Sequence, residues 1–188
     1  PLARRSIILS DEGVMLAQAL EIARGKVLYR DLDAFVGPGI WYLLAAVFSF
    51  LAPSVLLGRL VMLLGFGLTT MLSVRIALRL APPACALMTA AGLMVAYVWA
   101  FPSWTFAFYS PFAVLFAIAA LDRFLACRSG RHRRDLFFTG VLIGLSIGFK
   151  QNYGALTLLG VLVTLPVTHV ETLAELPQAM RRIVRDAG

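Results

Sequence analysis

The chain is poor in charged residues, and above all in acidic ones. Charged residues make up 14% of the 188 residues, hydrophobic residues make up 60%, and ten residues in all are Asp or Glu. No acidic residue occurs from Ala34 to Leu121. Together with a mean hydropathy of +0.85, this composition excludes an ordinary soluble domain, in which about 25% of residues are charged.

Cysteine and histidine are scarce as well, with two of each. Cys85 and Cys127 fall at predicted cytoplasmic helix ends, where a reduced pair is favoured over a disulfide. Neither His132 nor His169 has a second ligand at metal-binding spacing. The sequence has no Gly-rich phosphate-binding loop, and its net charge of +7 lies in short Arg clusters that flank apolar runs. That placement indicates membrane orientation and not nucleic-acid binding.

Long apolar runs fill most of the remaining sequence. A run of about 18 or more apolar residues crosses a bilayer as a helix, because lipid offers no partner for an unpaired backbone amide. We therefore predict an all-α fold, a polytopic transmembrane helical bundle. The expected spans are 55–79, 83–101, 111–127 and a helix pair at 136–149 and 152–168. Glycines at every fourth position in 136–149 (Gly140, Gly144, Gly148) predict close helix packing.

Two shorter helices precede these spans. Residues 12–24 have amphipathic periodicity, and we expect this helix to lie at the membrane surface in the first external loop. The helix at 39–51 is short and bounded by prolines, so we expect it to dip into the outer leaflet or lie along it, which places Asp11 outside. If it spans fully, Asp11 lies in the cytoplasm. The predicted modules are 1–170, with a truncated first helix, and a cytoplasmic amphipathic tail at 171–188.

Basic residues set the expected orientation. The densest cluster, Arg128 to Arg134, predicts a cytoplasmic loop. Counting spans in both directions then places Arg75 and Arg79 inside, and the loop at 101–110 and Lys150 outside. We predict that the chain is an integral protein of the bacterial inner membrane and that its site faces outward.

Four of the ten acidic residues fall near the start of the chain, at Asp11, Glu12, Asp31 and Asp33. Two carboxylates in a first helical turn could simply complement the helix dipole, which stabilises by about 0.3–1 kcal/mol each. Alternatively, the four face one external pocket. A carboxylate there could act as general base toward a hydroxyl acceptor, or hold a divalent cation such as Mg²⁺ or Mn²⁺.

Two basic residues are candidates for binding a lipid phosphate. Lys150 ends a short helix and is followed by two polar residues, Gln151 and Asn152, and ionisable groups at membrane depth often serve function. Arg59 lies on the external half of the 55–79 span. The alternative for both is interfacial anchoring of a helix end.

The external loop at 101–110 is dense in aromatic residues. Trp104 and Tyr109 could be interfacial anchors, as such residues usually are. They could instead form a wall that contacts a sugar or a prenyl chain.

An ordered set of short motifs resembles the GT-C glycosyltransferases, a superfamily that includes the protein O-mannosyltransferases and aminoarabinose transferases. The motifs, which cover most of residues 10–168, are Asp11-Glu12-Gly13, Tyr29-Arg30-Asp31, 37–44 (GPGIWYLL), Gly58-Arg59-Leu60 and 144–154 (GLSIGFKQNYG). The resemblance implies a polytopic enzyme that transfers a sugar from a polyprenyl-phosphate donor to a hydroxyl acceptor, and Asp11 as its catalytic base. Many relatives carry a second acidic residue in the next external loop, and 101–110 has none.

The mechanism expected from this resemblance is an inverting transfer. Asp11 deprotonates the acceptor hydroxyl, Lys150 and Arg59 stabilise the departing lipid phosphate, and Glu12 and Asp31 shape the site. The rival hypothesis is a lipid or solute transporter, which explains the helices equally well. A transporter, however, more naturally carries its acidic residues midway through its helices.

Overall fold

The structure is a computed structural model that describes residues 11–97, 108–127 and 132–168. Within these ranges the fold is all helical, and its only strand-like feature is an isolated bridge between Leu28 and Leu32. The helices are α1 (Asp11–Ala23), α2 (Gly39–Phe50), α3 (Val55–Leu80), α4 (Pro83–Val95), α5 (Ser110–Cys127), α6 (His132–Phe149) and α7 (Gln151–Thr168). The predicted all-α class is therefore confirmed for the described residues.

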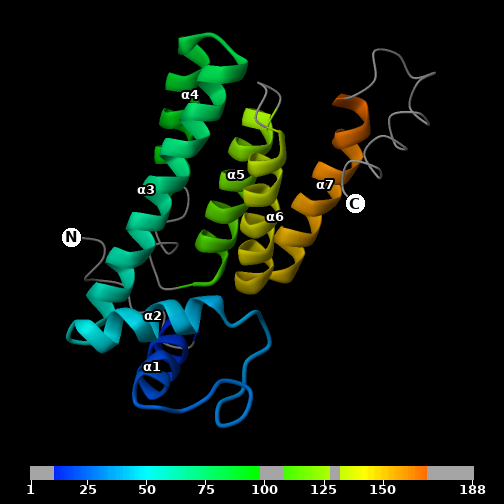
Figure 1. Cartoon of the computed structure of the whole chain (residues 1–188). Helices are drawn as coiled ribbons and strands as arrows, with labels where there is room; N and C mark the ends of the chain where they lie inside the picture. Colours follow the sequence, from blue (N-terminus) through cyan, green and yellow to red (C-terminus); the bar gives the residue numbers. More distant parts are fainter. Residues whose placement is uncertain (1–10, 98–107, 128–131, 169–188) are drawn as a thin grey trace.

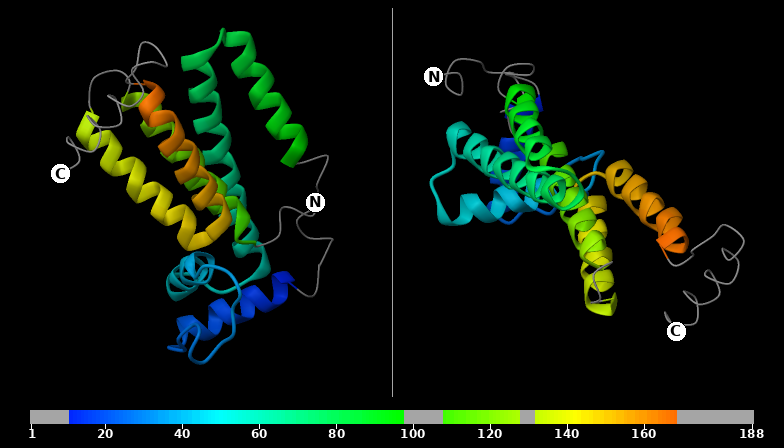
Figure 2. Two further views of the ribbon diagram at one scale, coloured as in Figure 1. Left: turned by 90° about the vertical axis from the view of Figure 1, so that its right-hand side faces the viewer. Right: turned by 90° about the horizontal axis from the view of Figure 1, so that it is seen from above.

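The helices form a bundle with a layer across one end (Figure 1). Helices α3 to α7 alternate in direction, with α4 folding back along α3 and α6 running against α5. Helices α1 and α2 lie across the end at which α3, α5 and α7 begin, and a second view shows the same arrangement (Figure 2). We call this the layered end. The alternation places Arg75 and Arg79 at the opposite end from Lys150, as the sequence predicted.

Proline and a serine cap set the bounds of the longest helix. The hydroxyl of Ser54 accepts a hydrogen bond from the amide of Leu57 at 3.1 Å, which satisfies one of the free amides in the first turn of α3. The helix ends at Leu80, just ahead of Pro82 and Pro83, which cannot continue it. With 26 residues, α3 is the one described helix that is long and apolar enough to cross a bilayer.

Two apolar clusters hold the helices together. The larger lies at the layered end and includes Met15, Leu16, Ala19, Ile40, Trp41, Leu44, Met62, Phe66, Phe112 and Phe149. The smaller, of Ala120, Phe124, Ile143 and Val161, joins α5, α6 and α7. Since a buried side chain of this size stabilises by about 1.5–3 kcal/mol, the larger cluster fixes α1 and α2 firmly to the bundle.

The contact between the layer and α6 is closest at glycines. A Cβ on Gly37 would overlap the carbonyl oxygen of Gly148, and one on Gly39, the first residue of α2, would overlap the ring of Phe149. By contrast, nothing in the described structure lies within 4 Å of a Cβ built on Gly140 or Gly144. The close packing predicted at Gly140 and Gly144 is therefore wrong for the described helices, because α6 packs on α5 through its other face, where Ser146 donates to the carbonyl of Ala113 at 2.8 Å.

We predict that Gly37→Ala destabilises the protein and that Gly140→Ala does not. The added methyl group at position 37 must displace backbone, and such overpacking costs about 1–3 kcal/mol. At position 140 the methyl group meets open space, and replacing a mid-helix glycine by alanine favours the helix by about 0.5–1 kcal/mol. Thermal unfolding in detergent, monitored by circular dichroism, measures the melting temperature of each variant. Equal melting temperatures for the two variants would contradict this account of the layer contact.

Candidate functional site at the layered end

A buried ion pair holds the first turn of α1 against α3. Arg59 donates from Nε to Glu12 Oε1 at 2.9 Å and from Nη2 to Glu12 Oε2 at 2.7 Å. The two side chains are 4% and 2% exposed. A bidentate pair of this kind is the strongest geometry available to arginine and carboxylate. The structure thus joins two residues that the sequence assigned to catalysis and to phosphate binding, and shields both from an incoming ligand.

The backbone of Asp11 begins α1, directly before Glu12. Its position is therefore at the same helix end that the ion pair fastens to α3. The side chain of Asp11 lies outside the part of the structure that is described, and its role as a catalytic base stays a prediction.

Lys150 lies at the layered end, between α6 and α7. Its Nζ is 3.1 Å from Ser110 Oγ and lies over the rings of Tyr109 and Tyr153, at 5.0 Å and 4.9 Å from their centroids. The faces of aromatic rings are negative and attract a cation within about 6 Å. The ammonium group is thereby held without a carboxylate partner among the described residues.

The Lys150 pocket is a cavity of about 330 Å³ between α3, α5 and α7. It is lined by Phe66, Thr69, Tyr97, Phe108, Ser110, Pro111, Val114, Lys150 and Tyr153. Ligand sites of this class have mostly apolar walls and a few polar groups that fix orientation. One cation and a few hydroxyl groups in an otherwise apolar wall suit an amphiphilic anion.

Four further residues predicted to bind substrate have different positions relative to this pocket. Tyr109 contacts Lys150 directly. Gln151 and Asn152 are exposed on the first turn of α7 and are not among the residues that line the cavity. Trp104 lies outside the described residues.

Asp31 and Asp33 both lie in the loop between α1 and α2, but their carboxylates have different surroundings. Asp31 accepts two hydrogen bonds from Arg30, at 3.0 and 2.8 Å, and one from the amide of Val27 at 2.8 Å. These contacts, of which the Arg30 hydrogen bonds weigh most, lower the pKa of Asp31 from 3.8 to about 2. Asp31 therefore closes the loop, whereas the carboxylate of Asp33 is exposed.

The backbone of this loop is also tied to α1 and α2. Gln18 donates from Nε2 to the carbonyl of Asp33 at 3.0 Å and accepts from Trp41 Nε1 at 2.8 Å. Tyr29 has a φ of 67°, in the left-handed region that a non-glycine residue occupies at a cost of about 1–3 kcal/mol. Its hydroxyl donates to the carbonyl of Val36 at 2.5 Å, and this bond keeps the strained turn in place.

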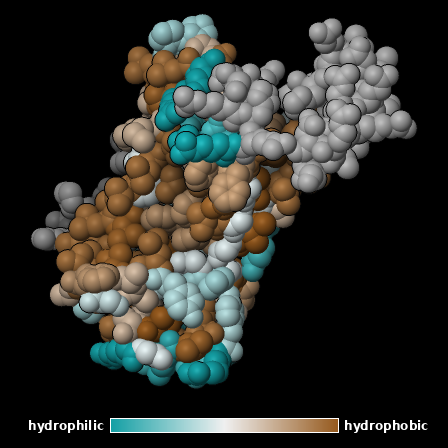
Figure 3. All heavy atoms as spheres, in the orientation of Figure 1, coloured by the Kyte–Doolittle hydropathy of each residue, from teal (hydrophilic) through white to brown (hydrophobic). Residues whose placement is uncertain are grey.

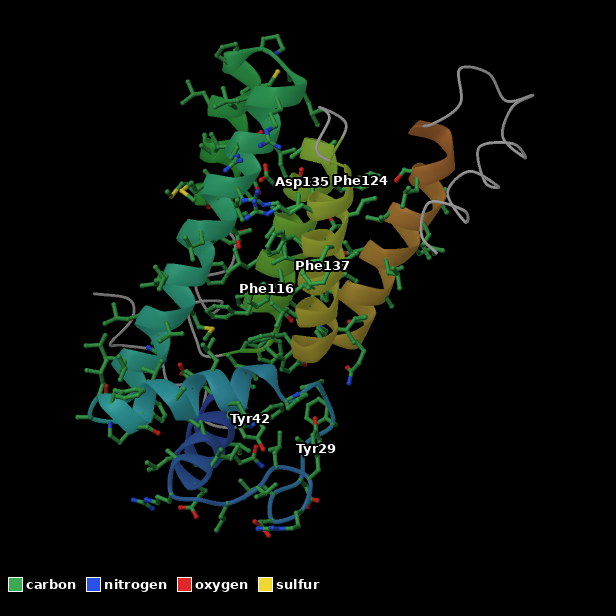
Figure 4. All side chains as sticks on the ribbon, in the orientation of Figure 1. Tyr29, Tyr42, Phe116, Phe124, Asp135 and Phe137 are labelled. Carbon is green, nitrogen blue, oxygen red and sulfur yellow. The ribbon has the colours of Figure 1, made fainter. Side chains whose placement is uncertain are left out.

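Sequence reasoning missed a second charged cluster, at the opposite end of the bundle. Asp122 of α5 is 1% exposed, and its Oδ1 lies 3.0 Å from Arg79 Nη1 and 3.3 Å from Arg75 Nε. The signal was present: one acidic residue in an apolar helix, and two arginines four residues apart in another. Asp135 is buried at this end too, far from Tyr29 at the layered end (Figure 4).

No described group of three or more His, Cys, Asp or Glu residues is arranged to hold a metal ion. The divalent cation considered from the sequence stays a prediction. Comparison with protein families, with curated proteins and with solved structures finds no match to this chain.

We predict that Glu12→Gln lowers the free energy of unfolding by about 3–5 kcal/mol, because it removes the carboxylate that binds the buried guanidinium of Arg59 through two hydrogen bonds. Denaturant unfolding in detergent measures the loss. Glu21→Gln is the matched control, since Glu21 forms exposed pairs with Arg24 and Lys26, and exposed pairs are worth at most about 1 kcal/mol. Losses of similar size in both variants would contradict the structural role of the buried pair.

The pKa of Asp31 gives a prediction for pH dependence. Because this pKa is lowered from 3.8 to about 2, the contribution of Asp31 to stability is complete above pH 3.8 and disappears as the pH falls through about 2. Carbon-13 NMR of the aspartate carboxyl groups should show one that titrates near pH 2. In Arg30→Ala that titration should move toward 3.8, and an unchanged midpoint would contradict the assigned cause.

Proposed function

We propose that the protein is a polytopic membrane glycosyltransferase that transfers a sugar from a polyprenyl-phosphate donor to a hydroxyl acceptor at the layered end. The observation that carries the proposal is the Lys150 pocket. In it, the ammonium group of Lys150 lies among apolar and aromatic side chains beside the α1–α2 layer. A lipid phosphate has the matching chemistry, with one anionic group and an apolar chain.

The distribution of hydropathy supports a membrane setting. Apolar side chains cover the middle of the face in Figure 3, and hydrophilic ones gather on the layer below and at the upper end. Large exposed apolar residues on α3, α4 and α7 include Leu64, Met71, Leu87, Met88, Leu159 and Val163. A contiguous apolar surface of this extent marks a contact with lipid or protein. At 1.5 Å per residue, the 26 residues of α3 measure about 39 Å, which is enough to cross a hydrocarbon core of about 30 Å.

In the proposed orientation the layered end faces outward. Arg75 and Arg79 lie at the other end, and basic residues are enriched on the cytoplasmic side of membrane proteins. Helices α1 and α2 then lie at the outer surface, which is the position expected for a helix too short to span.

The proposed reaction is a displacement at the anomeric carbon of the donor sugar. Asp11 takes the proton of the acceptor hydroxyl, whose oxygen forms a bond to the anomeric carbon. The bond between that carbon and the phosphate oxygen breaks, and the lipid phosphate leaves with the bonding electron pair. Lys150 stabilises the charge on the departing phosphate, and attack from the opposite side inverts the configuration.

The buried ion pair modifies the roles expected from the sequence. Glu12 and Arg59 bind one another, so we assign the phosphate to Lys150, and to Ser110 beside it. The pair instead positions the α1 terminus that carries Asp11.

Sugar transfer from a panel of polyprenyl-phosphate sugars, with membranes from cells that produce the protein, tests the proposal. We expect Asp11→Asn to lower the rate by about 10²–10⁴-fold, as for loss of a general base, and Lys150→Met by about 10²–10³-fold, as for loss of one charge-stabilising donor. Lys26→Met, which removes an exposed lysine from the same end, should leave the rate unchanged.

Absence of transfer at normal expression would overturn the proposal. Transfer that persists at the wild-type rate in Asp11→Asn would instead remove Asp11 from the reaction. Uptake or exchange of labelled lipid without any sugar transfer would favour the transporter hypothesis.

A further inference from the structure

A second pocket lies in the loop between α1 and α2, at the layered end. It has a volume of about 270 Å³ and is lined by Tyr29, Asp33, Ala34 and Phe35. Phe35 is 85% exposed and Tyr29 is 57% exposed. The described chain therefore presents two aromatic rings and one carboxylate around a small residue, Ala34.

The shape of this pocket is set by contacts that leave its side chains open to solvent. The strained turn at Tyr29 is fixed by the hydroxyl bond to Val36, and the amide of Tyr29 donates to the carbonyl of Leu32 at 2.8 Å. The carbonyl of Asp33 is held by Gln18, while its carboxylate makes no hydrogen bond or ion pair with the described residues. A strained backbone conformation that surrounding contacts maintain is typical of ligand clamps.

The pocket adjoins the Lys150 pocket through one ring contact. The rings of Phe35 and Tyr109 are in edge-to-face contact, with their centroids 6.3 Å apart and their planes at 88°. The ammonium group of Lys150 lies over the face of the Tyr109 ring. A group bound against Phe35 therefore lies next to Tyr109 and the Lys150 pocket.

We propose that this pocket binds the acceptor, and that the acceptor is itself a saccharide. This inference rests on the proposed function for its place in the reaction. A pyranose ring has apolar C–H faces that pack on aromatic rings, and its hydroxyls donate to a carboxylate such as Asp33. A lipid chain would leave the Asp33 carboxylate without a partner. A cationic ligand would gain little, since the loop has three basic residues, Arg24, Lys26 and Arg30, against two acidic ones.

Binding of mannotriose, maltotriose and chitotriose to the detergent-solubilised chain, followed by saturation-transfer-difference NMR, tests the pocket without requiring turnover. We expect at least one of the three to bind. Its dissociation constant should rise about fivefold to tenfold in Phe35→Ala and in Asp33→Asn, the loss of one aromatic or hydrogen-bonding contact. Phe35→Trp should bind as the wild type does. Phe50→Ala is the matched control, because Phe50 is 88% exposed and does not line the pocket.

In the transfer assay, the same Phe35→Ala variant should raise the KM of a saccharide acceptor and leave the KM of the lipid donor unchanged. A purely structural defect would alter both. The inference is overturned if none of the three saccharides binds, or if Phe35→Ala and Phe50→Ala weaken binding equally. It is also overturned if Phe35→Ala impairs association with phosphatidylglycerol vesicles and spares saccharide binding, which would make Phe35 a membrane anchor. Saccharide binding without sugar transfer would keep the pocket and refute the proposed function alone.

Discussion

The buried ion pair between Glu12 and Arg59 is the contact on which the layered end depends. Helix α1 has 13 residues, a length at which an isolated helix is marginal in water. Its apolar face packs on α2, and its first turn is fixed to α3 by the bidentate pair. Because both charges are almost fully removed from solvent, loss of either partner destabilises the fold far more than loss of an exposed ion pair would. The position of Asp11, one residue away, follows from that constraint.

The layer places two chemically different pockets beside each other. On the bundle side, Lys150 lies in an apolar cavity. In the loop between α1 and α2, Asp33 lines a second pocket together with the exposed rings of Tyr29 and Phe35. The contact of Phe35 with Tyr109 connects them. The proposed reaction joins an anionic lipid to a polar acceptor. It needs an apolar pocket and a polar pocket side by side, because the lipid chain and the acceptor favour different surroundings until the reacting atoms meet.

Local signals in the sequence predicted the helices well. Prolines, glycines and hydrophobic periodicity gave bounds for α2 and α3 within a residue or two of those observed, and the alternation of spans placed Arg75 and Lys150 at opposite ends. These features depend on neighbouring residues along the chain, and on how basic residues flank apolar runs.

The sequence could not predict which charged residues pair. Glu12 and Arg59 are 47 residues apart. They were assigned to catalysis and to phosphate binding, because nothing local indicates that their helices meet. Asp122 is visible in the sequence as one acidic residue in an apolar helix, but nothing local indicates that its partners, Arg75 and Arg79, lie on α3. The prediction of close packing at Gly140 and Gly144 of α6 was wrong for a different reason. The spacing of glycines predicts a helix face of small residues, but only tertiary contacts decide whether another helix covers that face. The sequence placed Tyr109 and Lys150 on the same predicted external side without predicting a contact, and the structure brings the two side chains together.

The central proposal is that the α1–α2 layer faces the outside of the membrane while the Arg75–Arg79 end faces the cytoplasm. Cys85 is an exposed native cysteine at the start of α4, on the proposed cytoplasmic side, and Lys26→Cys would add one in the layer, with Cys127 replaced by serine. In intact cells a membrane-impermeant maleimide should label position 26 and not Cys85, and after permeabilisation it should label both. Labelling of Cys85 in intact cells, with position 26 protected, would contradict the account.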